Sequence, residues 1–126
     1  MTTAIIGTGG LGSVIARELA AGGESLRLSS ADTESARTLA AQIGGAAVVA
    51  TGNRDALQGA GAVVLALRFI VLKGVLDEIA DLLTDRLVVV PSNPLSADAH
   101  GDVSRVLPEG QSSGEVVAGW LPAAAR

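Results

Sequence analysis

The chain has 126 residues, 48% of them hydrophobic, which is enough for one domain built around one core. Its net charge is −4, its Lys and Arg residues are scattered, and its only aromatic residues are Phe69 and Trp120, so it offers neither the basic surface nor the stacking side chains of a nucleic-acid-binding protein. The absence of cysteine excludes disulfides, thiolate zinc sites and a cysteine nucleophile.

Strand-like and helix-like patterns alternate along the chain. The predicted strands are Thr3 to Ile6, Ser25 to Ser29, Ala46 to Ala50, Ala62 to Leu67, and Leu87 to Val90. The predicted helices are Ser13 to Ala21, Asp32 or Thr33 to Ile43, and Ile70 to Leu83, with a short helix or a turn at Asp55 to Gln58. This order predicts an α/β fold, a Rossmann-like doubly wound parallel sheet with helices on both faces, in one domain over residues 1–126.

Each longer helix has apolar residues at a helical spacing, which predicts the side that packs on the sheet. The expected inward residues are Val14, Ile15 and Leu19; then Ala36, Leu39, Ala40 and Ile43; then Val71, Val75, Ile79 and Leu82. On the last of these helices Asp77, Asp81 and Asp85 recur at every fourth position, which predicts a solvated row of carboxylates rather than a converging metal cluster.

Residues 60–76 are almost wholly apolar, so a membrane span has to be considered. Arg68 and Lys73 interrupt this stretch, and its two halves have different periodicities, so a strand followed by a helix is the better interpretation. Met1-Thr2-Thr3 lacks the basic residues of a signal peptide. We therefore expect a cytoplasmic protein without a membrane segment.

The motif around which the chain is organised is Gly7-Thr8-Gly9-Gly10-Leu11-Gly12, between the first strand and the first helix. A glycine triplet in this position is the dinucleotide-binding fingerprint. Gly7 permits the sharp turn, Gly9 lets the backbone approach a pyrophosphate, and Gly12 lets the helix pack closely on the strand. The anion would rest on free amides at the positive end of the helix dipole. A purely structural tight turn is the alternative.

Ligands of such sheets bind beyond the carboxyl ends of the strands, here at the switch between the first and fourth strands. Four loops would line the site: Gly7 to Gly12, Ser29 to Thr33, Leu67 to Ile70, and Pro91 to Ser96. An NAD enzyme usually has a carboxylate after the second strand, and this chain has Ser29-Ser30, which favours NADP. Asp32 lies close by, so a shift of one residue would restore an NAD site.

Three stretches together carry a resemblance to a known family: Ala4 to Gly12, Ser29-Ser30, and Ser92-Asn93-Pro94-Leu95-Ser96. The resemblance is to a family of NADPH-dependent oxidoreductases that includes the NADP-linked reductase of the deazaflavin coenzyme (factor 420). It covers the family's amino-terminal Rossmann domain and implies that Thr8 to Leu11 hold the pyrophosphate and that Ser30 contacts the 2′-phosphate. It further implies direct hydride transfer from nicotinamide to a second ring, with deazaflavin as a possible co-substrate.

At the nicotinamide end we expect Leu67, Phe69, Asn93 and Pro94. Asn93 could bond the nicotinamide ribose or carboxamide, or could simply form the turn beside Pro94. We expect no protein nucleophile and no metal.

The chain departs from the family at several positions. The arginine that usually follows the serine is Ala31 here, and a lysine expected further on is matched by Ser35. Arg37 or Arg54 could supply the missing charge. Arg68-Phe69 replaces the usual Pro-Trp after the fourth strand. The resemblance implies a further strand and a helical segment that build the substrate side. We expect these to be absent here, and therefore a homodimer if a second subunit completes the cleft.

Two other functions stay open at this point. The chain could be a non-catalytic NAD(P)-binding module, a sensor or truncated relative, or a small enzyme of the same superfamily that acts on an imine or a keto acid.

The remaining polar residues favour ordinary structural roles. His100, the only histidine, lies near Asp98 and Asp102 in a polar stretch typical of a solvated loop. The serines have no histidine base at a predictable spacing. Trp120, on the expected final helix, is interpreted as a core or interface anchor.

Overall fold

The computed structural model describes all residues from Met1 to Arg126. Its main sheet has five parallel strands in the order β3-β2-β1-β4-β5. Their bounds are β1 Thr2–Ile6, β2 Ser25–Ser29, β3 Ala47–Val49, β4 Ala62–Leu65 and β5 Leu87–Val89. The chain proceeds outward from β1 to β3 and then returns to the other side of β1, so the predicted Rossmann-like topology and its switch point between β1 and β4 are confirmed.

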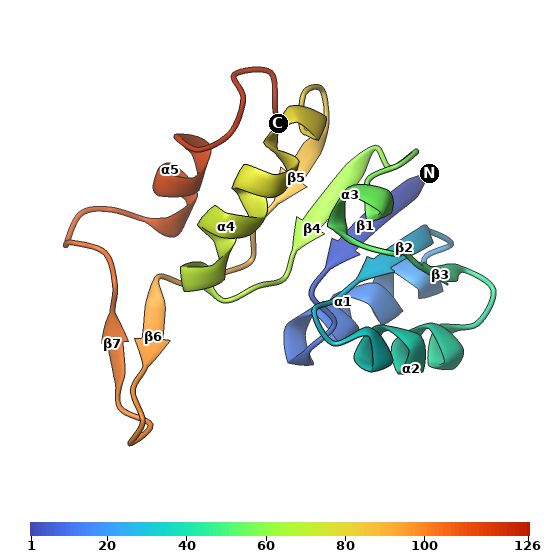
Figure 1. Ribbon diagram of the computed structural model, residues 1–126, viewed down its shortest axis with the longest axis horizontal. Helices are drawn as coiled ribbons and strands as arrows, with labels where there is room; N and C mark the ends of the chain where they lie inside the picture. Colours follow the sequence, from blue (N-terminus) through green and yellow to red (C-terminus); the bar gives the residue numbers. More distant parts are fainter.

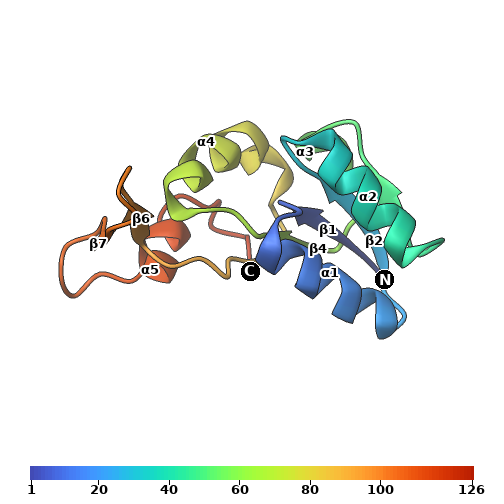
Figure 2. The ribbon, with the colours of Figure 1, turned by 90° about the horizontal axis from the view of Figure 1, so that it is seen from below.

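Helices cover both faces of the sheet. They are α1 Gly10–Ala21, α2 Thr33–Ile43, α3 Asn53–Ala56, α4 Phe69–Ile79 with a 3₁₀ turn at Ala80–Leu82, and α5 Ser113–Ala118. Residues of α1 and α2 form one apolar core with β1, β2 and β4, and those of α3, α4 and α5 form another on the opposite face. Figure 2 shows α1 and α4 on opposite sides of the central strands.

All four residues of β4 are buried, as expected of a strand covered on both faces. The predicted ends of several elements are wrong by a few residues. The fourth strand ends at Leu65 rather than Leu67, and the first helix begins at Gly10, within the glycine motif, rather than at Ser13. Helix α2 begins as predicted, since the Asp32 carboxylate accepts a hydrogen bond from the Glu34 amide at 3.2 Å.

Two expected inward residues lie at the surface. Val14 on α1 is 53% exposed, and the buried residues of that helix are Gly12 and Ala16, while the expected Ile15 and Leu19 pack against the same core. On α4 the buried stripe is Phe69, Leu72, Leu76 and Ile79, while Val71 is exposed. Small residues contact the sheet in α1 because the helix lies very close to it, and an apolar pattern alone does not reveal this.

The predicted row of carboxylates does not lie on one helix. Only Asp77 is in α4, because Asp81 lies in the 3₁₀ turn and Asp85 follows it with a positive φ of 62°. The hydrogen-bonding change after Ile79 breaks the four-residue repeat, so the three side chains do not share a face.

A two-stranded antiparallel hairpin, β6 Leu95–Ala97 and β7 Val103–Arg105, follows the main sheet and was not predicted. Figure 1 shows it extending away from the body of the molecule. His100 lies at its tip, where the Asp98 carboxylate accepts hydrogen bonds from the His100 and Asp102 amides. The acidic residue therefore orders the turn.

Helix α5 ends at Ala118, so Trp120 lies just beyond it and not on the final helix as predicted. Its ring packs against Phe69 with a centroid separation of 5.9 Å, which makes it a core anchor within the chain. No helix combines the length and the apolar character needed to cross a bilayer.

Candidate functional site

The strand register brings the predicted loops to one edge. Ile6, Ser29 and Leu65 lie at the same level on neighbouring strands, so the segments that follow β1, β2 and β4 leave the sheet together. The turn after β1 is fixed to both neighbours. The Gly7 amide donates to the Ser29 carbonyl at 2.9 Å, and the Ala66 amide donates to the Ile6 carbonyl at 2.9 Å.

At Gly7 and Gly12, the packing of the protein leaves no room for a side chain. Gly7 has φ of 100°, and a Cβ atom on it would lie 2.3 Å from the Ala66 carbonyl oxygen. On Gly12 a Cβ atom would lie 1.9 Å from the Gly7 carbonyl oxygen and close to Ala66. Both residues are therefore required to be glycine by the packing of α1 and the β4 loop on the turn.

Gly9 and Gly10 are different, because the protein gives no steric reason for either. A Cβ atom on Gly9 or Gly10 would meet nothing within 4 Å, and Gly9 has φ of −75°, which any residue can adopt. Both are exposed. The open space lies where the fingerprint would place a ligand.

The amides of the turn are also free. None of the N–H groups from Thr8 to Gly12 donates to a protein acceptor, and the N-cap residue Gly9 has no side chain to cap the helix. These groups lie at the positive end of the twelve-residue α1. Five unpaired donors at a helix start form a site suited to an anion such as a pyrophosphate.

The turn is held in place by α2. The Ser35 hydroxyl donates to the Thr8 carbonyl at 3.2 Å, and the Thr8 and Ser35 hydroxyl oxygens are 2.8 Å apart. Both residues line a cavity of about 390 Å³ between α1 and α2, together with Gly9 and Arg17. Ser35, where the resemblance led us to expect a lysine, therefore supports the turn.

At the end of β2 the two predicted serines have unequal surroundings. Ser29 is buried and its hydroxyl donates to the Asn53 side-chain oxygen at 2.7 Å, so its proton is already used. The Ser30 hydroxyl accepts a hydrogen bond from the Asp32 amide at 3.3 Å, which leaves its own proton free. Both line a cavity of about 380 Å³ between α2 and the segment after β3.

On the other side of the turn, a cavity of about 270 Å³ lies between the segments after β4 and β5. Leu67, Phe69 and Asn93, three of the four residues expected at the nicotinamide end, line it together with Leu11. Pro94 does not line this cavity, and its carbonyl accepts the Val106 amide at 2.8 Å at the base of the hairpin. The Asn93 carbonyl accepts the Leu95 amide at 2.8 Å, so its backbone forms the turn and its side chain has no protein partner.

Sequence reasoning missed Ser92 as a site residue. Its hydroxyl is buried without a hydrogen-bond partner, and the residue lines the same cavity as Asn93. Its position directly before Asn93 in the sequence could have identified it as a residue of the site. Its carbonyl accepts the Ser113 hydroxyl at 2.7 Å, so α5 fixes this segment.

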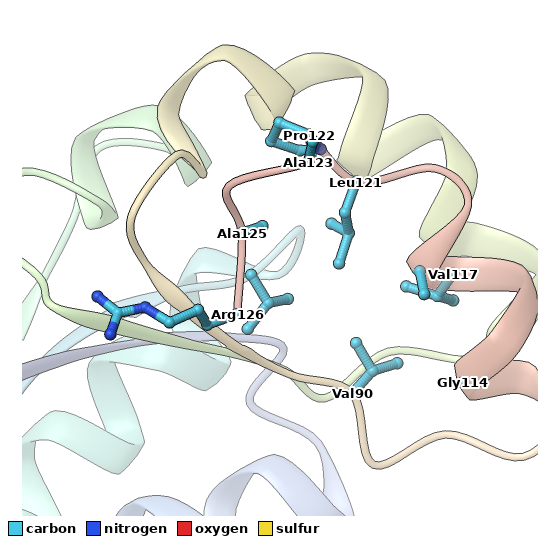
Figure 3. A pocket seen from close by; sticks show the side chains of 10 residues that line it. Val90, Gly114, Val117, Leu121, Pro122, Ala123, Ala125 and Arg126 are labelled. Carbon is cyan, nitrogen blue, oxygen red and sulfur yellow. The ribbon is translucent and has the colours of Figure 1, made fainter.

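The largest cavity, about 410 Å³, lies elsewhere. It is formed by β5, α5 and the last residues of the chain, and Val90, Val117 and Leu121 project toward one another across it (Figure 3). Its lining is mostly aliphatic and contains none of the glycine turn. It lacks the converging polar groups of a nucleotide site.

Two cationic side chains near α3 are engaged in ion pairs. Arg54 donates to both Asp81 carboxylate oxygens, at 2.7 and 2.8 Å, and to the Glu78 carbonyl. These contacts raise the pKa of Arg54 and lower that of Asp81, in both cases chiefly through the side-chain hydrogen bonds between the two residues. Arg27 donates to the carbonyl and the carboxylate of Asp55.

Comparison with solved structures gives the same fold. A provisionally assigned F420-dependent NADP reductase from Arthrobacter sp. superposes with a TM-score of 0.84 at 24% identity, covering 98% of this chain and 59% of that chain. The present chain therefore spans less than two thirds of it. An imine reductase from Streptomyces aurantiacus gives a TM-score of 0.66 at 26% identity, covering 74% of this chain and 32% of that one.

An imine reductase from Myxococcus stipitatus, solved in complex with NADP+, gives a TM-score of 0.67 at 23% identity, with 74% and 32% of the two chains covered. No curated protein matches the sequence. The family described as NADP oxidoreductase, coenzyme F420-dependent, matches residues 2–94, which include the glycine turn, both serines after β2 and Asn93-Pro94. With this match over most of its length, the chain belongs to the family of F420-dependent NADP oxidoreductases.

Proposed function

We propose that this chain binds NADP(H) along the carboxyl edge of its sheet and serves in an oxidoreductase that transfers hydride between nicotinamide and a small acceptor. The observation that carries the proposal is the pair Gly9 and Gly10. The protein's own packing explains Gly7 and Gly12 but leaves the other two without a structural reason. A bound pyrophosphate supplies that reason, since it would need the space that a side chain would fill.

The residues at this edge fit the three parts of a dinucleotide: the pyrophosphate, the adenosine end and the nicotinamide end. Amides from Thr8 to Leu11 would hold the pyrophosphate, and Ser30 would contact the ribose at the adenosine end. Ser29 would act indirectly, because its hydroxyl is already bonded to Asn53. Leu11, Leu67, Phe69 and the amide of Asn93 would border the nicotinamide, with Pro94 fixing the turn beside them.

Bound NADPH would supply the hydride, and the protein's part would be positioning. The apolar side chains of Leu67 and Phe69 would exclude water from one side of the nicotinamide. The Asn93 side chain and the unpaired Ser92 hydroxyl would orient its polar groups, because both are free of protein partners at this cavity. No side chain is assigned to proton transfer.

A deazaflavin is the first acceptor to test, because of the family to which the chain belongs. An imine is the second, because structures of similar fold include imine reductases. The purified protein would be titrated with NADPH by calorimetry, and NADPH oxidation would then be followed with a deazaflavin or with a cyclic imine. We expect binding, and oxidation with one of the two acceptors.

Failure to bind NADPH or NADH would refute the proposal. Binding without oxidation of NADPH by either acceptor would instead favour a non-catalytic dinucleotide-binding module.

A further inference from the structure

The cavity at the end of β2 has one charged residue in its lining. Thr33, Ala36 and Arg37 of α2 form one wall, and the segment from Val49 to Gly52 forms the other. The spacing of three and four residues places those α2 side chains on the same helix face. Arg37 is the only charged residue around this cavity, which has a volume of about 380 Å³.

The polar groups that accompany Arg37 are donors. Ser30 keeps its hydroxyl proton, because its oxygen accepts the Asp32 amide. Thr33 lines the same cavity, and its hydroxyl makes no hydrogen bond within the protein. The carboxylates of Asp32 and Glu34 are among the lining residues of the neighbouring cavity between α1 and α2, not of this one. A guanidinium with hydroxyl donors and no carboxylate in the lining fits a phosphate monoester.

Three other arginines are committed to protein partners, and Arg68 lines the separate cavity between the segments after β4 and β5. Arg54 is bound to Asp81 and to the Glu78 carbonyl. Arg27 is bound to Asp55. Arg17 donates to the Gln42 side chain at 2.6 Å and lines the cavity between α1 and α2. Of the two arginines that the sequence leaves open as substitutes, Arg37 is the one that reaches the cavity beside Ser30.

We propose that Arg37 determines the preference for NADP over NAD by binding the 2′-phosphate beside Ser30, where Ala31 provides no charge. This inference rests on the proposed dinucleotide-binding function. The positive charge that binds the 2′-phosphate would then come from the second turn of α2 and not from the loop after β2.

A phosphate would have to compete with the Glu34 carboxylate for Arg37, and the existing ion pair is weak. Its guanidinium is paired with the Glu34 carboxylate one turn earlier, and the two side chains are 64% and 74% exposed. An ion pair this exposed contributes little, whereas a guanidinium can bind a phosphate with two parallel hydrogen bonds. A phosphate monoester carries a charge of about −1.5 to −2 at pH 7. The phosphate therefore displaces Glu34 as the partner of Arg37.

The test compares nucleotides that differ by the 2′-phosphate. NADP, NAD, adenosine 2′,5′-bisphosphate and adenosine 5′-monophosphate are titrated by calorimetry into the parent protein and into Arg37→Gln, Arg37→Lys and Arg54→Gln. We expect Arg37→Gln to weaken the two 2′-phosphorylated ligands by about 10- to 100-fold, the range for one charge-assisted hydrogen-bonded contact. NAD and the monophosphate should be unaffected, because they lack the group that Arg37 binds.

The two other variants serve as matched controls. Arg37→Lys keeps the charge without the two-pronged geometry and should retain part of the preference. Arg54→Gln removes an arginine of similar exposure away from the cavity and should change none of the four affinities. Circular dichroism melts verify that each variant is folded.

Glu34→Gln provides an independent measurement. Without the competing carboxylate, the 2′-phosphorylated ligands should bind several-fold more tightly, and adding Arg37→Gln should abolish that gain. If Arg37→Gln leaves the ratio of NADP to NAD affinities unchanged, or weakens all four ligands equally, the inference is wrong while dinucleotide binding stands. If the parent binds none of the four, the proposed function itself fails.

Discussion

Gly9 and Gly12 differ in the space available for a Cβ atom. At Gly12 it would lie 1.9 Å from a carbonyl oxygen of the same turn, and at Gly9 it would meet nothing within 4 Å. The fingerprint thus combines residues that the fold needs with residues that only a ligand needs. This difference makes each function separately testable.

We expect Gly9→Val to fold and to lose NADPH binding. The valine replaces a glycine N-cap and should cost about 1 kcal/mol of unfolding free energy, but its side chain enters the space that a pyrophosphate requires. Thermal melts and calorimetric titration measure the two effects. Gly74→Val is the matched control, because Gly74 also borders open space but lies on α4. Equal NADPH affinities for Gly9→Val and the parent would show that the turn is only structural.

For Gly12→Ala we expect the opposite result, a loss of fold stability. The added methyl group would overlap the Gly7 backbone, which cannot move without displacing the loop after β4. Overpacking of this kind costs at least about 1–3 kcal/mol. Urea denaturation of the parent and the variant provides the comparison, and an unchanged midpoint would contradict the close approach of α1 to the turn.

Among the secondary-structure elements, α3 is joined to β2 through the Asp55 carboxylate, which pairs with Arg27. Asp55 accepts hydrogen bonds from the Thr51 amide at 2.8 Å and hydroxyl at 3.2 Å, and from Arg27 at 3.0 Å. The Thr51 backbone hydrogen bond is the largest of the contacts that hold the pKa of Asp55 below its ordinary value of 3.8, followed by the Thr51 hydroxyl and Arg27. Asp55 therefore stabilises the fold in its ionised form.

The sign of the pH dependence follows from that direction. The contribution of a carboxylate with a lowered pKa is complete above its ordinary pKa and is lost as the pH falls through the lowered value. Asp55→Asn should reduce the melting temperature at pH 7, and the difference from the parent should shrink as the pH falls below 3.8. Asp77→Asn, in an exposed pair with Lys73, is the control. A difference independent of pH would contradict an ionised Asp55 as the cause.

Element identity was more predictable than element placement. The alternation of apolar runs and glycines was sufficient to predict five strands and the helices between them, because a parallel sheet with crossovers needs that order. The exposed Val14 was not predictable, since it depends on how closely α1 approaches the sheet, and the apolar pattern did not reveal the change to a 3₁₀ turn after Ile79. The β6–β7 hairpin was missed because its short strands are largely exposed and contain no apolar run.

For the whole molecule, the site depends on loops from four strands brought to one edge. All four loops were predicted from the strand order, but the segment after β3, which lines the cavity beside Ser30, was not among them. The sequence could not distinguish Ser29 from Ser30, because the bond between Ser29 and Asn53 joins residues 24 positions apart. Nor could it exclude Arg54, whose partner Asp81 lies 27 positions away.

NADPH should therefore stabilise these loops together. At a ligand concentration of 100 times Kd, we expect the free energy of unfolding to rise by about 2.7 kcal/mol. In hydrogen exchange, protection should increase from Thr8 to Gly12 and in the segments after β2, β4 and β5, while the tip of the β6–β7 hairpin stays unchanged. Protection of one segment alone would argue against a dinucleotide spanning the edge.

Arg126 covers one border of the main sheet, and this limits how copies of the protein can associate. The Arg126 amide donates to the Arg86 carbonyl at 2.9 Å, and the Arg126 carbonyl accepts the Val88 amide, so backbone groups beside and within β5 are already satisfied. At the opposite border, β3 is only three residues long. Unsatisfied strand borders nucleate aggregation. Breaking the contacts of Arg126 with Arg86 and Val88 would uncover β5 and should make a monodisperse preparation prone to forming insoluble assemblies.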